Sequence, residues 1–483
     1  MTQSILEKYP NYEATIGIEV HVQLSTQSKI FCSCHNEISK QPNKNICPIC
    51  AGYPGVLPVI NKEVVSNAIL MGLATNSTIT KNTSFARKHY FYPDLPKNYQ
   101  ITQDTHPICT EGSVKINLAD GTEKNIRLIR IHMEEDAGKN IHSTTTNESF
   151  VDLNRCGTPL LEIVSYPDIS SSDEARAYLK TLRNIVLYLG IGTGNMEDGA
   201  FRADTNISVR KKGAKQLGTK IELKNINSFK FIADAIDYEI QRQIETLEAH
   251  QSLTQETRLW DTHEKKTVAM RSKEVAADYR YFQEPDLPLL EIDEKWIAEV
   301  RKKLPELPEQ KLNRFLEQGL SAYEAQILID DLALADYFEL AYKNYASKNL
   351  INWLLRNVMG YLKEHKISLT EFKLTPYYLA ELVKLIDKGT INTKVAQEIF
   401  EETAQVGKSP ALLVKEKGLE QIDSMDELKK VSQSIIDQNP AQVNAYKAGN
   451  ERLFGFFVGQ VMKETQGKAN PQKVNEILKK LLS

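Results

Sequence analysis

The chain has 483 residues, of which 41% are hydrophobic and 25% are charged. This composition is typical of globular domains, so it excludes a wholly disordered protein, and the length suggests about three domains. The 60 basic and 63 acidic residues give a formal net charge of −3, so a polyanionic partner requires a local basic patch. No stretch approaches the ~18 consecutive apolar residues of a membrane span, and no secretory signal opens the chain. We therefore expect a cytoplasmic protein with no membrane contact.

The first informative segment is IGIEVHVQL, in which apolar and polar residues alternate. Successive side chains of a strand point to opposite faces, so Glu19, His21 and Gln23 are predicted to project together from the polar face. A carboxylate beside an imidazole suits a metal site. A strand with one solvated face would give the same pattern.

Four of the six cysteines follow close together, as Cys32, Cys34, Cys47 and Cys50. A C-x-C pair and a C-x-x-C pair separated by twelve residues suit a tetrahedral Cys₄ zinc site. Such a zinc ion would have a structural role. Four buried reduced thiols or a redox pair are the alternatives, and the other two cysteines are expected to be unpaired.

Acidic residues collect in two further predicted strands. The segment IRIHMEEDAGK contains Glu134, Glu135 and Asp136, and adjacent carboxylates repel one another unless a cation lies among them. An acidic loop is the alternative. Glu162 lies inside the apolar run TPLLEIVS, where an unpaired carboxylate is costly, so it is expected to be paired or bound to a metal. The residues that follow, 171–190, have the spacing of an amphipathic helix.

A last polar strand is predicted over 199–210, where Arg202, Asp204 and Asn206 share one face and would form a floor for a charged ligand. The groups expected to line one sheet face are Glu19, His21, Glu134, Glu135, Glu162, Glu197, Asp198 and Asp204. Oxygen ligands favour Mg²⁺ or Mn²⁺, often together with substrate phosphates, so the pattern indicates metal-assisted phosphoryl transfer. His21 is an unusual ligand for Mg²⁺, which leaves Mn²⁺, or a supporting role for His21, open. The sequence has no G-x-x-x-x-G-K-[ST] motif, which excludes a P-loop enzyme.

The pattern of the chain changes near residue 297. Residues 1–297 combine short runs of alternating apolar and polar residues with turns and helices. This pattern predicts an α+β domain built on an antiparallel sheet. After a proline-rich segment, helical periodicity predicts two all-helical domains at 298–410 and 411–483. The last of these has seven basic and three acidic residues over 441–483, a balance of +4. A solvated helical surface would explain this charge equally well.

Several longer motifs resemble a known family. They are IGIEVHVQL, FCSC with CPIC, YFYPDLPKNYQIT, IHMEEDAGK, VDLNRCGTPLLEIVSYPD, NMEDGAFRADTNISV, TKIELKNINSF and DYRYFQEPDLP. With the tail YKAGNERLFGFFVGQVMKETQGKANPQKVNEILKKLL, they closely resemble the B subunit family (GatB) of the aspartyl/glutamyl-tRNA(Asn/Gln) amidotransferases over essentially the whole chain. Gln283 stands where many members have proline, and some members lack the zinc cysteines, which fits a structural metal.

The resemblance implies a cradle domain similar in fold to glutamine synthetase and guanidino kinases, with ATP and Mg²⁺ bound on its antiparallel sheet. There the side-chain carboxylate of a mischarged Glu-tRNA(Gln) or Asp-tRNA(Asn) would be phosphorylated and then amidated. Ammonia would come from the amidase (A) subunit, and the small (C) subunit would complete a heterotrimer. The helical domain and the tail domain would hold the tRNA.

The resemblance also implies roles for particular residues. Positions that match the family's metal ligands are His21, Glu135 and Glu162, with Glu19 close by, and the catalytic group is completed by Asp204 and Arg202. The residues expected to bind the nucleotide are Lys97, Glu134, Arg155, Glu197, Asp198, Asn206 and Arg280.

Two other functions stay open from the sequence. One is a free-standing ligase that amidates a small acid, as glutamine synthetase does, although a long helical and basic tail has no use there. The other is a tRNA-binding scaffold without catalysis, although Glu162 and the neighbouring acids then have no purpose.

Overall fold

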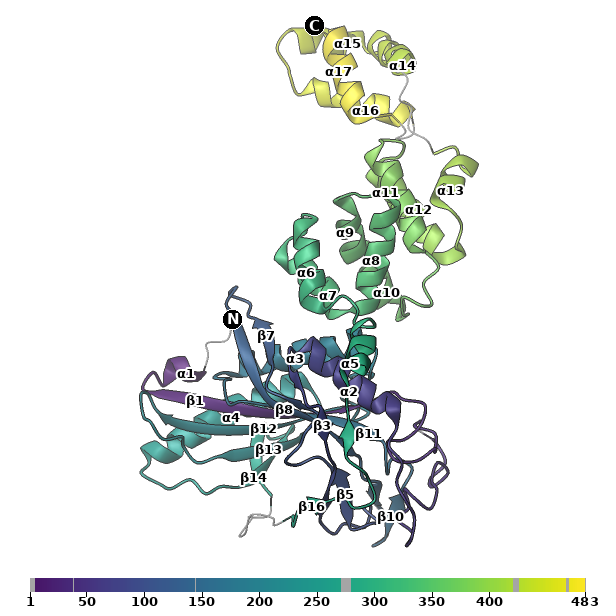
Figure 1. Cartoon of the computed structure of the whole chain (residues 1–483). Coiled ribbons are helices and arrows are strands. Elements are labelled where there is room, and N and C mark those ends of the chain that lie inside the picture. Colours follow the sequence, from purple (N-terminus) through teal and green to yellow (C-terminus); the bar gives the residue numbers. More distant parts are fainter. Residues whose placement is uncertain are drawn as a thin grey trace. The chain divides into compact units, whose positions relative to one another are not determined.

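The computed structural model describes residues 5–37, 39–143, 145–270, 279–419, 425–465 and 469–482 (Figure 1). The contacts divide the chain into two compact units, Met1–Lys311 and Leu312–Ser483. The first unit contains a large sheet with helices, which confirms the predicted mixed α+β class. The division into three domains stays a prediction. Within the described residues, no helix is both long enough and apolar enough to cross a lipid bilayer.

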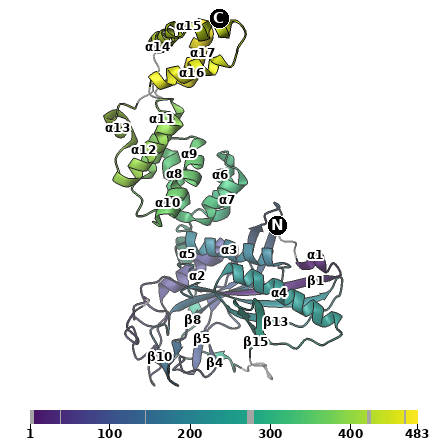
Figure 2. The same cartoon turned by 180° about the vertical axis from the view of Figure 1, so that it is seen from behind.

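A ten-stranded sheet forms the centre of the first unit (Figures 1 and 2). Its strand order is β15-β14-β13-β12-β1-β11-β8-β6-β2, and β7 also pairs with β8. Neighbouring strands are antiparallel except β13 and β14, which are parallel. The strands are β1 (Tyr12–Gln23), β2 (Thr78–Ile79), β6 (Cys109–Thr110), β7 (Ser113–Asn117), β8 (Glu123–Glu135), β11 (Pro159–Ser165), β12 (Phe201–Lys211), β13 (Ile221–Ile226), β14 (Thr257–Asp261) and β15 (Lys266–Ala269).

Three smaller sheets accompany the large one. They pair β9 (Lys139–His142) with β10 (Ser149–Asp152), β3 (Asn82–Thr83) with β17 (Leu290–Glu291), and β4 (Ala86–His89) with both β5 (Tyr99–Thr102) and β16 (Phe282–Gln283). The helices of this unit are α1 (Ile5–Lys8), α2 (Lys62–Ala74), α3 (Ser172–Tyr188), α4 (Phe229–Glu248) and α5 (Glu294–Arg301). The predicted helix over 171–190 is confirmed by α3.

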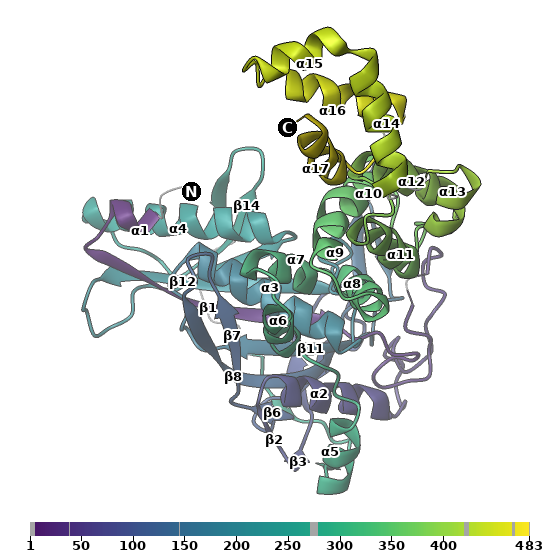
Figure 3. The ribbon, with the colours of Figure 1, turned by 90° about the horizontal axis from the view of Figure 1, so that it is seen from above.

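The hydrophobic core lies between the sheet and the helices α2, α3 and α4, which cover one face of the sheet (Figure 3). Ile16, Ile18, Val20 and Val22 of β1 are fully buried in this core. Because strand side chains alternate, the polar residues of β1 must point to the opposite face. The predicted alternation is therefore confirmed, and it places the candidate site on the face that these helices leave uncovered.

The second unit is helical in its described part. Its helices are α6 (Pro308–Glu317, which begins in the first unit), α7 (Ala322–Asp330), α8 (Leu332–Asn344), α9 (Asn349–Trp353), η1 (Leu354–Val358, a π-helix), α10 (Met359–His365), α11 (Pro376–Asp387), α12 (Thr393–Val406), α13 (Pro410–Glu416), α14 (Met425–Gln438), α15 (Pro440–Lys447), α16 (Leu453–Glu464) and α17 (Pro471–Leu482). Helix α13 packs on α11 and α12, whereas α14, α16 and α17 share a separate hydrophobic core.

Candidate active site

A cavity of about 1270 Å³ opens in the first unit on the polar face of the sheet. Its floor carries side chains from β1, β8, β11, β12 and β13, and part of its wall comes from Tyr90, Tyr279 and Tyr281. Asp152 at the end of β10 lines it as well, and the residues that line it from loops include Asn36, Glu37, Ser39, Asn154, Arg155, Thr158, Thr193, Asn195, Glu197 and Asp198. Residues far apart in the sequence therefore meet in one polar space.

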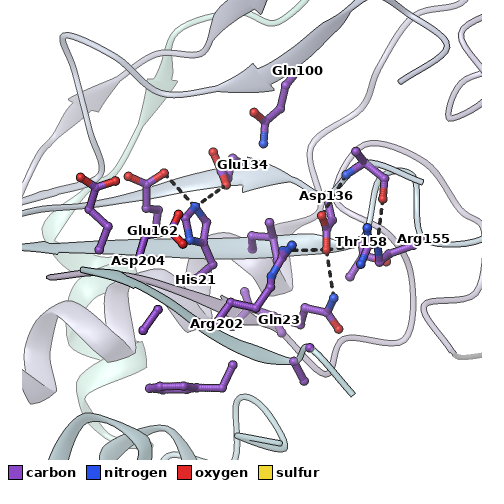
Figure 4. A pocket seen from close by; sticks show the side chains of 18 of the residues that line it. His21, Gln23, Gln100, Glu134, Asp136, Arg155, Thr158, Glu162, Arg202 and Asp204 are labelled. Atoms are coloured by element: carbon purple, nitrogen blue, oxygen red, sulfur yellow. Dashed lines mark hydrogen bonds and ion pairs between the residues drawn. The ribbon is translucent and has the colours of Figure 1, made fainter. Parts of the chain in front are cut away.

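Three neighbouring strands bring His21, Glu134 and Glu162 together (Figure 4). His21 on β1 lies opposite Glu162 on β11, and Glu162 in turn lies opposite His132 on β8. The Nε2 atom of His21 is 3.4 Å from Glu134 Oε1 and 3.2 Å from Glu162 Oε2. Cis ligand atoms around an octahedral Mg²⁺ with bonds of about 2.1 Å are about 3.0 Å apart, so this donor set fits a small divalent cation.

His132 belongs to the same cluster, although the sequence pattern gave no role to it. Its Nε2 atom is 3.2 Å from Glu162 Oε2 and 3.7 Å from Glu134 Oε2. On the other side of the ring, Arg130 Nε donates a hydrogen bond to Nδ1 over 3.3 Å. In a neutral ring the proton must then lie on Nε2, which donates to Glu162. His132 thereby orients the Glu162 carboxylate.

The charges of the cluster balance one another. Burial disfavours the ionised Glu162, but the charges and hydrogen bonds of His132 and His21 outweigh it and hold the pKa of Glu162 well below its usual range. Burial also opposes protonation of His132, but Glu162 and Glu134 outweigh it and raise the pKa of His132 to about 9. The hydrogen bond from Arg130 instead fits the neutral ring. A cation between the two carboxylates favours that neutral form, because it supplies the positive charge in place of the proton.

Glu19 and Asp204 form an acidic pair beside this cluster. They lie opposite each other on β1 and β12. Glu19 accepts a hydrogen bond from Asn206 Nδ2 at 3.0 Å, and Lys224 Nζ is 2.9 Å from Asp204 Oδ2. Burial, together with the charges of Glu162 and Asp204, raises the pKa of Glu19. Glu19 is therefore near the cluster, as expected, but its carboxylate bonds to Asn206 rather than to His21.

A second group of side chains in the cavity is organised around Asp136 (Figure 4). Its carboxylate accepts hydrogen bonds from Gln23 Nε2 at 3.0 Å and Arg202 Nη2 at 2.9 Å. Arg155 donates to the backbone carbonyls of the adjacent residues 137 and 138, at 2.9 and 2.6 Å. The Nε atom of Arg202 is buried and has no hydrogen-bond partner among the described residues. The Arg202 side chain as a whole is partly exposed and lines the cavity, where its guanidinium suits an anionic oxygen atom of a ligand.

Glu135 does not lie with His21 and Glu162, contrary to the expectation from the family resemblance. Because side chains alternate along β8, Glu134 points into the cavity and Glu135 points to the opposite face. There Glu135 forms an ion pair with Lys97 and accepts a hydrogen bond from the Ile101 backbone N–H at 2.9 Å. Lys97 accordingly neutralises a buried acid, and it is not among the described residues that line the cavity.

Of the other residues expected to bind nucleotide, Glu197 and Asp198 line the cavity from the loop before β12, while Asn206 contacts Glu19. Arg280 is also outside the described lining; its backbone carbonyl contacts the Nδ1 atom of His89 at 3.0 Å. Lys88 and Lys224 line the cavity but did not stand out in the sequence, and Asp136, which stood out as one of three adjacent acids, was given no particular role. Their positions depend on strand pairing, which a local pattern does not contain.

The four clustered cysteines form a second candidate metal centre, as predicted. Their sulfur atoms all lie within 4.8 Å of one another. Cys50 Sγ is 4.0 Å from Cys34 Sγ and 3.9 Å from Cys47 Sγ. A tetrahedron with Zn–S bonds of about 2.3 Å has edges of about 3.8 Å, so the geometry fits a Cys₄ zinc ion. The buried Lys29 places Nζ 3.7 Å from Cys50 Sγ, where an ammonium stabilises a thiolate.

The fold and the site define an α+β protein with a carboxylate-lined cavity and a cysteine metal loop. Residues 14–298 match the family described as GatB/GatE catalytic domain, and residues 336–482 match the GatB domain. The B subunit of the aspartyl/glutamyl-tRNA(Asn/Gln) amidotransferase of Crocosphaera subtropica is 51% identical over 484 residues, which cover 98% of each chain. The proteins of the same name from Persephonella marina and Geotalea daltonii are 50% and 52% identical, over 98% of this chain and 99% of theirs.

The chain therefore belongs to the B subunit family of the aspartyl/glutamyl-tRNA(Asn/Gln) amidotransferases. The resemblance drawn from the motifs is confirmed. A family of amidotransferase subunits has members that act in assemblies of more than one chain.

Proposed function

We propose that this protein is the component of a tRNA-dependent amidotransferase that activates and amidates the aminoacyl group. ATP would phosphorylate the side-chain carboxylate of a mischarged Glu-tRNA(Gln) or Asp-tRNA(Asn), and ammonia from the partner amidase would then displace the phosphate. The amidase and a small third chain would complete a heterotrimer. The first unit would have the cradle fold of glutamine synthetase and guanidino kinases, and the tail would bind tRNA.

The observation that carries this proposal is that one cavity contains both a candidate cation site and arginine side chains. Glu134, Glu162 and His21 fit Mg²⁺, while Arg202, which lies opposite His21 on β12, and Arg155 line the same cavity and suit phosphate oxygens. A nucleotide whose terminal phosphates lie among these residues would satisfy both groups. When bound, Mg²⁺ would neutralise charge that develops on the transferred phosphoryl group.

The residues of the chain have separate tasks in this scheme. Glu134, Glu162 and His21 would hold the cation, and His132 would orient Glu162 through its Nε2–H. Arg202 and Arg155 would stabilise phosphate oxygens as the γ-phosphoryl passes from ATP to the carboxylate, which leaves ADP and an acyl phosphate. Ammonia then attacks the carbonyl carbon and inorganic phosphate leaves, which forms the amide.

The direct test combines mischarged tRNA, ATP and ammonium with the chain and its co-purified partners. Gln-tRNA or Asn-tRNA should form only when ATP and Mg²⁺ are present. Free glutamate and aspartate serve as controls, because a free-standing ligase would amidate them. Binding of tRNA without cleavage of ATP would instead support the scaffold.

Metal binding at His21 is expected to weaken as the pH falls. The pKa of His21 is raised because its contacts with Glu162 and Glu134 outweigh the effect of burial. Below that pKa a proton occupies the ring nitrogen that would bind the metal, so affinity should decrease about tenfold per pH unit. Titrations of Mn²⁺ followed by electron paramagnetic resonance between about pH 6 and pH 8 would show this trend. A constant affinity would contradict the role of His21 as a ligand.

We also propose that the Cys₄ group binds a structural zinc ion. Elemental analysis of the purified chain should give about one zinc per molecule, since Cys₄ sites with this geometry are closed and bind tightly. Replacing Cys47 by alanine should abolish it. A full complement of free thiols without metal would favour the alternative of reduced cysteines.

A further inference from the structure

Hydrogen bonds join the loop that carries the four cysteines to residues 151–154, which contribute to one wall of the cavity. Asn43 Nδ2 donates to the carbonyl of Val151 at 3.0 Å, and the N–H of Leu153 donates to Asn43 Oδ1 at 2.8 Å. The backbone N–H of Asn43 also donates to Asp152 Oδ1 at 3.0 Å. Asn154 makes the matching contacts in the other direction, as its Oδ1 accepts from the N–H of Asn45 at 2.8 Å and its Nδ2 donates to the carbonyl of residue 41 at 2.7 Å.

We call these contacts of Asn43 and Asn154 the asparagine clamp. They join segments that are about 110 positions apart in the sequence. Asn154 is 8% exposed, so its amide would be costly to leave unpaired. Asn43 has a left-handed backbone (φ 55°), which few residues other than glycine and asparagine adopt. Both asparagines are thus suited to this connection.

The cysteine side chains pack against the next residues of the same wall, Cys156 and Gly157. Cys156 is buried in one apolar cluster with Cys32 and Cys50. A Cβ atom on Gly157 would lie 3.4 Å from the Cδ of Lys29 and 3.5 Å from the Cβ of Cys50. The segment 155–158 consequently has the cysteine loop directly against it.

The positively charged side chain of Arg155 extends from this wall into the cavity. Arg155 lies between Asn154 of the clamp and Cys156 of the cysteine cluster, and it lines the cavity together with Asp152 and Asn154. On the far side it is held by carbonyls of residues 137 and 138 and by Asp136 Oδ2 at 3.6 Å. A shift of the wall would therefore move Arg155 relative to the floor.

We propose that the Cys₄ centre, acting through the asparagine clamp, sets the position of Arg155 and thereby the affinity of the cavity for the phosphates of a nucleotide. This inference rests on the proposed function, because it assumes that ATP occupies the cavity. Asn43 and Asn154 are positioning residues in it. Both act through Arg155; Asn43 is outside the described lining of the cavity, whereas Asn154 is part of it.

The test is a binding cycle on the full chain with its co-purified partners, with ATP and Mg²⁺ as the probe in isothermal titration calorimetry. Asn43→Gly keeps the left-handed backbone and removes the two side-chain hydrogen bonds. It should weaken ATP binding by about fivefold or more, which is the change expected for one net hydrogen bond, with zinc content unchanged. Asn43→Asp retains the oxygen that accepts the hydrogen bond from the Leu153 N–H. Its affinity for ATP should therefore lie between those of the wild type and Asn43→Gly. Asn76→Gly is the matched control, since Asn76 has a similar backbone (φ 53°) but does not line the cavity.

Removal of the metal by a chelator completes the cycle. It should weaken ATP binding to the wild type, and weaken it less in Asn43→Gly, because both changes act through the same wall. Unchanged ATP affinity in Asn43→Gly, or effects of metal removal and substitution that simply add, would overturn the inference alone. A wild-type chain that binds no ATP would overturn the proposed function and this inference with it. Equal melting temperatures of Asn43→Gly and Asn76→Gly would exclude general unfolding as the cause.

Discussion

Replacing Glu162 by glutamine is expected to reduce the formation of Gln-tRNA or Asn-tRNA by about 10³-fold or more, while tRNA binding is retained. Glutamine has the same size, but it removes the negative charge that both His21 and His132 face at 3.2 Å. The cavity then loses a ligand for the proposed cation. Initial rates at saturating ATP and Mg²⁺ measure the first effect, and filter binding measures the second. Near-normal turnover in this variant would contradict the metal assignment.

The matched pair Glu134→Gln and Glu135→Gln separates the candidate ligand set that the structure brings together from the set implied by the family resemblance. Glu134→Gln should lower the affinity for Mn²⁺ strongly, because its carboxylate lies 3.4 Å from His21 Nε2. Glu135→Gln should leave this affinity close to wild type, because its carboxylate contacts Lys97 on the other face of β8. Loss of Mn²⁺ binding in Glu135→Gln alone would restore the assignment made from the sequence.

The limits of the sequence-based prediction at β8 have a physical cause. The alternation of apolar and polar residues correctly placed Glu19 and His21 on one face of β1. It did so because every residue on the other face, which packs against the helices, is apolar. At the end of β8 the residues from Ile131 to Glu135 are all buried, so the two faces look alike. Strand β5 contacts both acids, because its Thr102 Oγ1 donates to Glu134 and its Ile101 N–H donates to Glu135. A period of two then cannot decide which acid faces the cavity.

His132 shows a second limit, because its role depends on strand register. In the segment IRIHMEEDAGK it is an ordinary polar residue in an alternating strand. It becomes part of the cluster only because β11 places Glu162 opposite both His132 and His21. The cysteine centre, by contrast, was predictable from spacing alone, since its four ligands lie on one short loop. Local ligand sets are therefore easier to predict than those assembled across a sheet.

Deleting residues 420–483 is expected to weaken tRNA binding by at least about tenfold at low salt and to flatten its dependence on salt. The deleted part carries the excess of basic residues in 441–483, and each lost phosphate contact lowers the slope of log K against log salt by about 0.7–0.9. Cutting after residue 419 keeps α13, which packs on α11 and α12. Helices α14, α16 and α17 have their own core, so their removal should leave the remaining helices folded. Filter binding over a series of salt concentrations measures both quantities.

Charge substitutions in the full-length chain control for effects of truncation. Lys447 and Lys463 are exposed on α15 and α16, so replacing both by serine should reduce the salt slope without affecting the core of the tail. Replacing both by arginine retains the charge and should leave the slope near wild type. Because the phosphates of any tRNA present the same charge, the loss should be similar for cognate and non-cognate tRNA. Full tRNA affinity after the truncation would show that the basic tail is only a solvated surface, and that the first unit or the preceding helices bind the tRNA.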